Sequence, residues 1–158
     1  MASKKLEFIK LLLIEADEFL MKGDAVQSSE KLYKAAEECI KALSEIFNLE
    51  EVKAAEEKGR WTVTLLEKAV RKLTNKLGIE VQLGWDAANH LHIWGFHEAK
   101  LDKEDVEGRK SIIKRLIELL EKHLLMNETT ANPKKIVEDF RRLGAPLKGW
   151  LIPLFSQL

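Results

Sequence analysis

Apolar residues recur at the spacing of an α-helix along almost the whole chain, and we find no convincing β-strand with a period of two. In the first expected helix, one face carries Leu6, Ile9, Leu13, Ala16 and Leu20. A stripe of this kind is buried by packing against other helices. The sequence therefore predicts an all-α fold.

Glycines and capping residues divide this pattern into separate helices. Gly23 ends the first helix, and Asp24 caps a second one that runs to about residue 48. Gly59 ends a short helical piece, and the next helix opens at residues 61–62, with Thr64 and Glu67 spaced as a capping box. A longer helix is expected at residues 80–101. Further boundaries are expected at Gly78, which closes the third helix, at Asp102, which caps the fifth, and at Pro133, the first position of a short sixth helix.

The length of 158 residues suits one domain with a substantial hydrophobic core. We expect residues 1–126 to form a helical bundle. Residues 127–158 are expected to add a polar stretch, NETTAN, then the short helix and an irregular apolar tail, GAPLKGWLIPLFSQL. The apolar side chains of this tail either pack back across the bundle or contact a partner or a second copy.

Positive and negative side chains balance, because Lys plus Arg and Asp plus Glu each number 26. No overall field therefore draws the chain onto nucleic acid or an anionic membrane. Charged residues interrupt the apolar run near the N-terminus, and no stretch approaches the roughly 20 apolar residues that span a bilayer. The single cysteine, Cys39, fits a reducing compartment. We expect a soluble, cytoplasmic protein without a membrane partner, and its abundance of Lys and Glu resembles hyperthermophile proteins.

The stretch HLHIWGFHEAKL, which begins at His90, contains three of the chain's four histidines. At about 100° per residue of an α-helix, His90, Trp94 and His97 share one face with Asp86. His92 falls on nearly the opposite side, among apolar residues, and is expected to be a core histidine satisfied by a hydrogen bond. This geometry leaves the first face as the candidate site.

Metal binding and acid–base catalysis are the two chemistries to compare on that face. About 10 Å of helix rise separates His90 from His97, which is too far for one shared ion, so we expect no metal and no other cofactor. Asp86 and His90 are four residues apart and make the better acid–base pair, with His97 beside Glu98 as the other candidate. The candidate catalytic residues are His97, His90 and Asp86, and the candidate ligand-binding residues are His90, Trp94, His97 and Glu98.

Basic residues form two stripes that are interpreted as solvated helix faces. They lack the interleaved aromatic residues that mark RNA-binding platforms, and positive charge near a helix C-terminus complements the helix dipole. The stripes are Lys68, Arg71, Lys72 and Lys76 in the third helix and Arg109, Lys110, Lys114 and Arg115 in the fifth.

Two segments resemble a known family. AAEECIKALSEIF, at residues 35–47, resembles a helix of the HEPN superfamily of small helical domains. GRWTVTLLEKAVRKL and LHIWGFHEAKL, at residues 59–73 and 91–101, look like the archaeal PaREP family, which belongs to that superfamily. The resemblance covers about residues 6–124. It implies an up-and-down four-helix bundle of HEPN type, with extra short helices here, and it implies a homodimer.

Many HEPN proteins are metal-independent ribonucleases or toxins of toxin–antitoxin pairs, with an Arg placed a few residues before a His. Here His97 takes the position of that His, and His92 stands where the Arg is expected. An Arg is permanently cationic, whereas a His is mostly neutral at pH 7. The leading hypothesis is a helical interaction domain that holds a nucleotide or RNA near His90, Trp94 and His97. The alternatives are a residual ribonuclease or toxin–antitoxin component that uses His97 as general base, with Asp86 and His90 assisting, and a purely structural role for the histidines.

Overall fold

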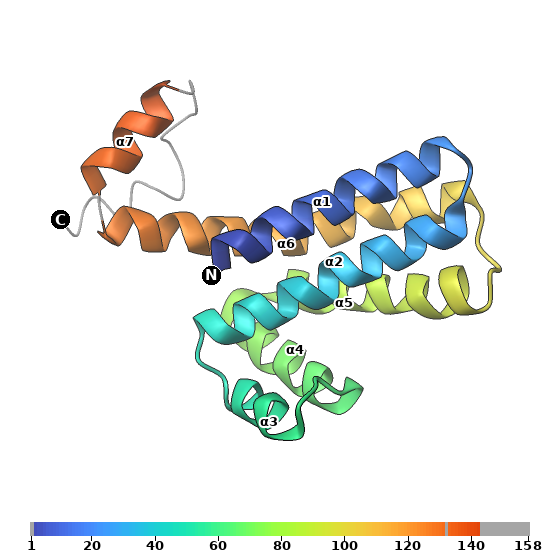
Figure 1. Ribbon diagram of the computed structural model, residues 1–158, viewed down its shortest axis with the longest axis horizontal. Helices are drawn as coiled ribbons and strands as arrows, with labels where there is room; N and C mark the ends of the chain where they lie inside the picture. The colour runs from blue at the N-terminus through green and yellow to red at the C-terminus, as the bar shows by residue number, and fades with distance from the viewer. Residues whose placement is uncertain (1, 132, 143–158) are drawn as a thin grey trace. The chain divides into compact units, whose positions relative to one another are not determined.

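The structure, a computed structural model, describes residues 2–131 and 133–142, and the regular elements in this part of the chain are all helices, without a strand (Figure 1). The elements in chain order are α1 (Ala2–Met21), α2 (Ala25–Ile46), α3 (Glu50–Lys58), α4 (Val63–Leu77), α5 (Ile79–His90), the π-helix η1 (Leu91–His97), α6 (Lys103–Ala131) and α7 (Pro133–Arg142). The prediction of an all-α bundle is confirmed. The predicted apolar tail at 143–158 lies outside the described residues.

The helix ends follow from local capping chemistry. Gly23 and Gly59 adopt left-handed backbone, with φ of 79° and 74°, which is easily reached by glycine and confirms both predicted ends. Asp24 caps α2, as predicted, because its side chain accepts a hydrogen bond from the Gln27 amide. The predicted cap of α6, Asp102, is also confirmed, since the side chains of Asp102 and Asp105 each accept a hydrogen bond from the backbone amide of the other residue.

The predicted helix start at residues 61–62 is confirmed, but its predicted capping box and one later helix end are wrong. The N-cap of α4 is Thr62, whose hydroxyl accepts from the Leu65 amide, so Thr64 and Glu67 do not form a capping box. Glu67 accepts instead from the indole Nε1 of Trp85 at 2.8 Å. The polar stretch after residue 126 is not a gap, because α6 continues through it to Ala131. Polar residues are compatible with an exposed helix, so polarity alone does not mark a helix end.

The centre of the bundle is α2. It runs beside α1 as a helical hairpin and also packs against α4, α5 and η1 (Figure 1). Its Cys39 is fully buried, as predicted, with Sγ 3.6 Å from the Leu116 carbonyl oxygen of α6. The buried side chains with less than 2% exposure include Trp85, Ile40, Leu43, Leu73, Leu91 and Ile113. Helix α2 therefore sets the positions of the elements that surround it.

The chain forms two compact units, Met1–Leu120 and Glu121–Leu158. The predicted boundary at residues 126–127 stays a prediction. In the described residues, no helix is both long and apolar enough to cross a membrane.

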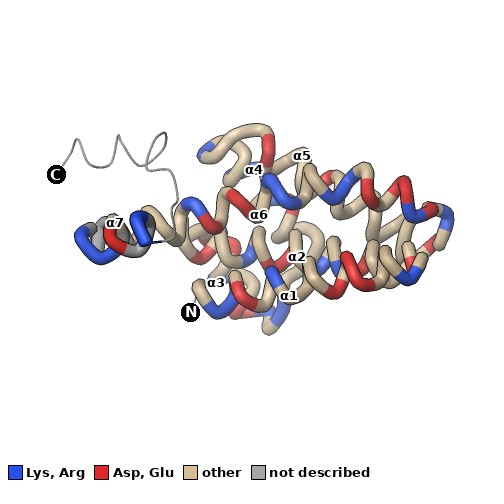
Figure 2. The backbone as a smooth tube through the Cα atoms, turned by 90° about the horizontal axis from the view of Figure 1, so that it is seen from above, with Lys and Arg blue, Asp and Glu red and all other residues tan. Residues whose placement is uncertain are grey.

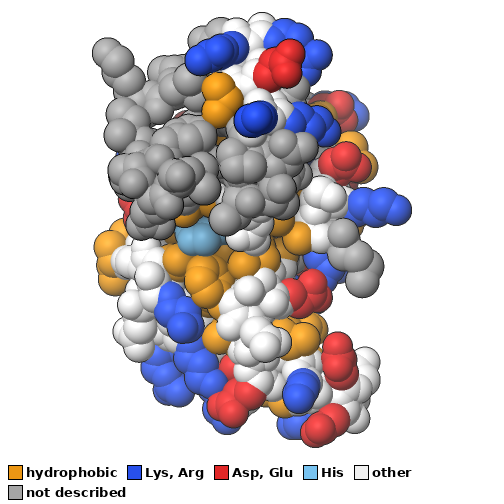
Figure 3. Space-filling model, turned by 90° about the vertical axis from the view of Figure 1, so that its left-hand side faces the viewer, with side chains coloured by type: hydrophobic (Ala, Val, Ile, Leu, Met, Phe, Trp, Pro, Cys, Tyr) orange, Lys and Arg blue, Asp and Glu red, His pale blue; other side chains and the backbone are white. Residues whose placement is uncertain are grey.

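Opposite charges are interspersed along the helices (Figure 2), and the face drawn in Figure 3 carries both signs. Some of them pair between helices, as Lys31 with Glu15 and Lys110 with Asp17 do, both at 2.7 Å. Exposed pairs of this kind contribute at most about 1 kcal/mol each. The folded chain therefore gains little from any one of them, and hydrophobic burial around α2 is its main source of stability.

Candidate histidine site

The segment that carries the histidines is a π-helix, which continues directly from α5. Its C-terminal end is closed by a hydrogen bond from the Glu98 amide to the Ile93 carbonyl oxygen, at 2.9 Å and five residues apart. A π-helix has a wider turn than an α-helix, and residues five apart therefore lie above one another. The spacing of His92 and His97 is thus in register here, whereas in an α-helix it is not.

Gly95 allows this segment to approach α2 closely. A Cβ atom at Gly95 would lie only 2.6 Å from Ser29 Cβ, far inside van der Waals contact. Ser29 is itself fully buried, and its hydroxyl donates to the Ala25 carbonyl oxygen at 2.7 Å. A small residue on each side of the contact brings the two backbones together and places the η1 side chains beside those of α2.

Three side chains from η1 and α2 form a hydrogen-bonded chain. His92 Nδ1 lies 3.0 Å from Glu30 Oε2, and His92 Nε2 lies 3.1 Å from His97 Nε2. The ring of Tyr33 stacks on His92 at 4.0 Å between centroids. The ring of Phe96 contacts that of His97 edge to face at 5.1 Å. We call Glu30, Tyr33, His92, Phe96 and His97 the histidine cluster.

The chain of hydrogen bonds fixes where the protons lie. A carboxylate only accepts, so His92 donates from Nδ1 to Glu30. In neutral His92 the other nitrogen, Nε2, must then accept from His97 Nε2–H. When one ring carries an extra proton, the hydrogen between the two Nε2 atoms can be held by either ring. The hydrogen-bonded chain therefore leads from Glu30 to the exposed side chain of His97.

Tyr33 stays protonated beside this chain. Burial first, and then the charge of Glu37, raise the pKa of Tyr33 well above its usual range. Its hydroxyl donates to Glu37 Oε1 at 3.4 Å. The Tyr33 ring therefore covers one side of His92, and its hydroxyl remains neutral. Glu30 is thus the acidic group that is hydrogen-bonded to the histidines.

The structure groups the predicted site residues differently from the sequence. The prediction of one α-helix over residues 80–101 is wrong, and with it the placement of His92 and His97 on opposite faces. His92 does make the predicted hydrogen bond, although its side chain is 26% exposed. His90 faces α6, where burial, and then the charge of Arg109, lower its pKa while Asp105 opposes that shift.

The other predicted residues take no part in the hydrogen bonds of the histidine cluster. Asp86 accepts a hydrogen bond from Gln82 Nε2 at 2.8 Å, and no hydrogen bond joins it to His90. Trp94 is 46% exposed, and Glu98 is also exposed. Glu30 is the functional candidate that sequence reasoning missed, because nothing in the helical pattern of α2 relates it to a histidine so distant in the chain.

Metal-binding groups are not clustered in the described part of the chain, where no set of three or more His, Cys, Asp or Glu side chains could hold an ion. In the histidine cluster the two Nε2 atoms are hydrogen-bonded to each other. Proton transfer and hydrogen bonding are the chemistry that this arrangement offers.

Comparison with known proteins gives a family and a fold. The family model described as the archaeal PaREP1/PaREP8 family matches residues 4–117. A crystal structure of a Sulfolobus solfataricus protein is similar, with 40% sequence identity and a TM-score of 0.67 over 73% of this chain and 95% of that one. A solution structure of the same target has 40% identity and a TM-score of 0.65 over 73% of this chain and 90% of that one. No curated protein matches significantly.

Proposed function

This chain belongs to the archaeal PaREP1/PaREP8 family, and from that premise we propose that it is a helical binding domain for a phosphate-bearing ligand, either a nucleotide or a short RNA. The ligand is held at the histidine cluster, with His97 donating a hydrogen bond to a phosphate oxygen. Trp94, 46% exposed on the same π-helix, offers a ring on which a base can stack.

The observation that carries this proposal is the chain from Glu30 through His92 to His97. A phosphate beside the exposed His97 would pair with the positive charge that the histidine pair carries when it is protonated. The net charge of the chain is zero, so a ligand gains little from the overall field and depends on this local charge.

A binding measurement with matched variants tests the proposal. Wild-type chain, His97→Ala and His90→Ala are titrated with nucleotides and short RNAs at pH 6, and the midpoint of thermal unfolding is followed. We expect the ligand to raise the midpoint of the wild type and of His90→Ala, and to have a much smaller effect on His97→Ala. The proposal fails if no nucleotide or short RNA shifts the midpoint, or if His90→Ala loses binding as His97→Ala does.

Metal-independent RNA cleavage is the second candidate, and the fixed tautomers of the histidine pair favour it. Neutral His97 donates from Nε2 to His92, so its other nitrogen, Nδ1, would accept a proton from a ribose 2′-hydroxyl. The 2′-oxygen would then attack the adjacent phosphorus, and the 5′-oxygen would leave with a proton from water. His92 and Glu30 would position His97. Incubation of mixed RNA with chelator tests this: cleavage that His97→Ala leaves undiminished would point to contamination and exclude the reaction.

We also propose that the protein is a homodimer in the cytoplasm. Three apolar side chains on one face of α1 support self-association: Phe8, Leu11 and Ile14, which are 45%, 49% and 55% exposed. Exposed apolar residues on successive turns of a helix are typical of an interface. The cytoplasmic location is supported by the single cysteine, Cys39, because cytoplasmic proteins do not depend on disulfides.

A further inference from the structure

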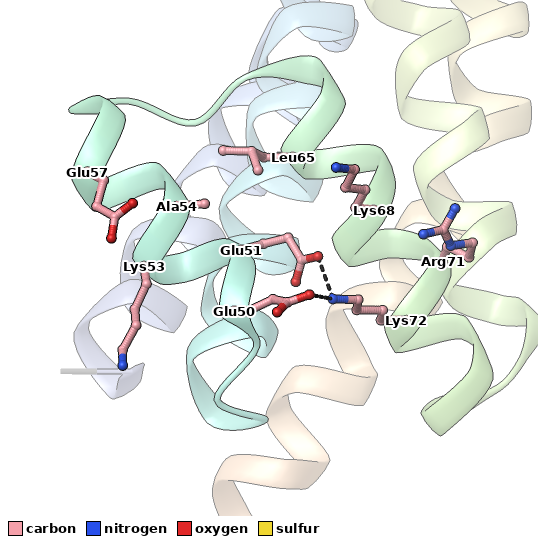
Figure 4. A pocket seen from close by; sticks show the side chains of 9 residues that line it. All are labelled: Glu50, Glu51, Lys53, Ala54, Glu57, Leu65, Lys68, Arg71 and Lys72. Atoms are coloured by element: carbon pink, nitrogen blue, oxygen red, sulfur yellow. Dashed lines mark hydrogen bonds and ion pairs between the residues drawn. The ribbon is translucent and has the colours of Figure 1, made fainter.

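A polar cavity lies between α3 and α4 and uses no residue of the histidine cluster. Its volume is about 410 Å³, which is within the size range of small-molecule sites. The side chains that matter for its chemistry are Glu50, Glu51, Leu65, Lys68, Arg71 and Lys72 (Figure 4). We call this space the α3–α4 cavity.

The carboxylate of Glu51 is buried in this cavity and only half satisfied. The side chain is 3% exposed, and its Oε1 accepts from Lys72 Nζ at 2.6 Å. Its other oxygen, Oε2, is buried and has no hydrogen-bond partner among the described residues. Buried polar atoms are almost always hydrogen-bonded, so an unpartnered carboxylate oxygen on a residue that lines a cavity indicates a missing donor.

The charges beside Glu51 define what that donor should be. Lys72 also binds Glu50 Oε1, at 2.7 Å, and so one ammonium group is shared by two carboxylates (Figure 4). The three side chains together carry one net negative charge. A ligand ammonium group would neutralise that charge and donate to Glu51 Oε2. A neutral N–H group would donate to Glu51 Oε2 but would not neutralise the charge.

The outer part of the cavity has the opposite sign. Lys68 and Arg71 are exposed on α4, and within the described residues neither forms an ion pair. Lys72 mainly, and Lys68 to a lesser degree, hold the pKa of Glu50 below its usual range, so the Lys68 charge reaches the exposed carboxylate of Glu50. An anionic group would be attracted to Lys68 and Arg71, and repelled by the buried carboxylate of Glu51.

We propose that the α3–α4 cavity binds a small zwitterionic molecule. Its ammonium group donates to Glu51 Oε2, and its carboxylate or phosphate group pairs with Lys68 and Arg71. A simple anion would leave Glu51 unsatisfied, and a simple amine would leave both outer cations unpaired. In the sequence this stripe of basic residues was interpreted as a solvated helix face. Because the buried Glu51 lies opposite this stripe, the proposal gives Lys68 and Arg71 a role in binding.

Two matched sets of probes test the proposal by calorimetric titration of the full chain. The first set is 4-aminobutyrate, butylamine and butyrate, which share one carbon skeleton and differ in charge. The second is phosphoethanolamine, ethanolamine and inorganic phosphate. We expect the zwitterion of at least one set to bind about tenfold more tightly than either singly charged relative. The set that shows this preference distinguishes a carboxylate from a phosphate ligand. Equal binding within both sets, or no saturable binding, would overturn the proposal.

Variants locate the binding in the cavity. Glu51→Gln replaces the unpartnered charged acceptor, and Lys68→Ala with Arg71→Ala removes the outer cations. Each change should weaken binding of the preferred zwitterion about tenfold. Lys58→Ala, an exposed lysine on α3 outside the cavity, is the control and should bind as the wild type does. If Glu51→Gln unfolds the chain, the exposed double variant still decides the question. Unchanged affinity in that folded variant would overturn the proposal.

Discussion

At the residue scale, the candidate site depends on which nitrogen of each histidine carries a proton. Glu30 sets this pattern from outside η1, because its carboxylate can only accept from His92 Nδ1. The second nitrogen of His92 is thereby fixed as the contact to His97. A carboxylate behind an imidazole that faces an exposed group is a common way to orient a histidine for proton transfer.

The tautomer of His92 is therefore the first prediction. In the wild type at pH 8, we expect His92 to carry its proton on Nδ1, and Glu30→Ala should shift it to the Nε2–H form because the acceptor is lost. Long-range ¹H–¹⁵N correlation spectra of the imidazole rings measure this directly. Lys34→Ala, an exposed change on the same helix, is the control. An Nε2–H form of His92 in the wild type would contradict the arrangement.

His90 supplies a second prediction, about stability and pH. Burial, and then Arg109, lower its pKa in the folded state, so the folded chain resists protonation of His90 more than the unfolded chain does. Protonation below about pH 6.5 therefore favours unfolding, and the stability present at neutral pH decreases as the pH falls. We expect His90→Gln to lose less stability than the wild type between pH 7 and pH 5 in urea unfolding. Identical losses in the two proteins would show that His90 has no part in this dependence.

At the scale of the element, Gly95 determines how η1 meets α2. A Cβ atom would collide with Ser29, whose backbone is fixed in the central helix. We expect Gly95→Ala to lower the free energy of unfolding by about 1–3 kcal/mol, because η1 would have to move away. Gly108 on α6 has nothing within 4 Å of its Cβ position, so Gly108→Ala should raise stability by about 0.5–1 kcal/mol. Urea unfolding of the two variants measures both changes in the free energy of unfolding. A Gly95→Ala variant that is as stable as the wild type would contradict the close contact.

The helix ends and η1 differ in how much the sequence reveals. Asp24, Gly23 and Gly59 act on residues a few positions away, so their roles are readable from the sequence alone. The stretch HLHIWGFHEAKL also pointed to the segment that carries the site. The grouping of its histidines was wrong because it assumed the α-helical step throughout. The change to a π-helix accompanies a contact between Gly95 and Ser29, and that contact depends on tertiary packing, which no local pattern encodes.

At the scale of the whole molecule, α2 connects the features described above. It buries Cys39 against α6, receives η1 at Ser29, and supplies Glu30 and Tyr33 to the histidine cluster. Helix α1 covers another side of α2 and leaves its own outer face apolar. Packing of α1 on α2 does not require an apolar outer face, so the bundle itself does not explain these exposed side chains. An exposed apolar face of this kind is typical of an interface with a partner.

Self-association through that face is the final prediction. If α1 forms the interface, lysines at Leu11 and Ile14 introduce like charges into it, while the buried face of α1, with Ile9 and Leu12, is unchanged. We expect the wild type to be a dimer by light scattering coupled to size-exclusion chromatography, and Leu11→Lys with Ile14→Lys to be a folded monomer. Val63→Lys is the matched control, because Val63 is an apolar side chain 69% exposed on α4, outside the proposed interface. A double variant that remains dimeric would exclude α1 as the interface, and a monomeric wild type would exclude the dimer itself.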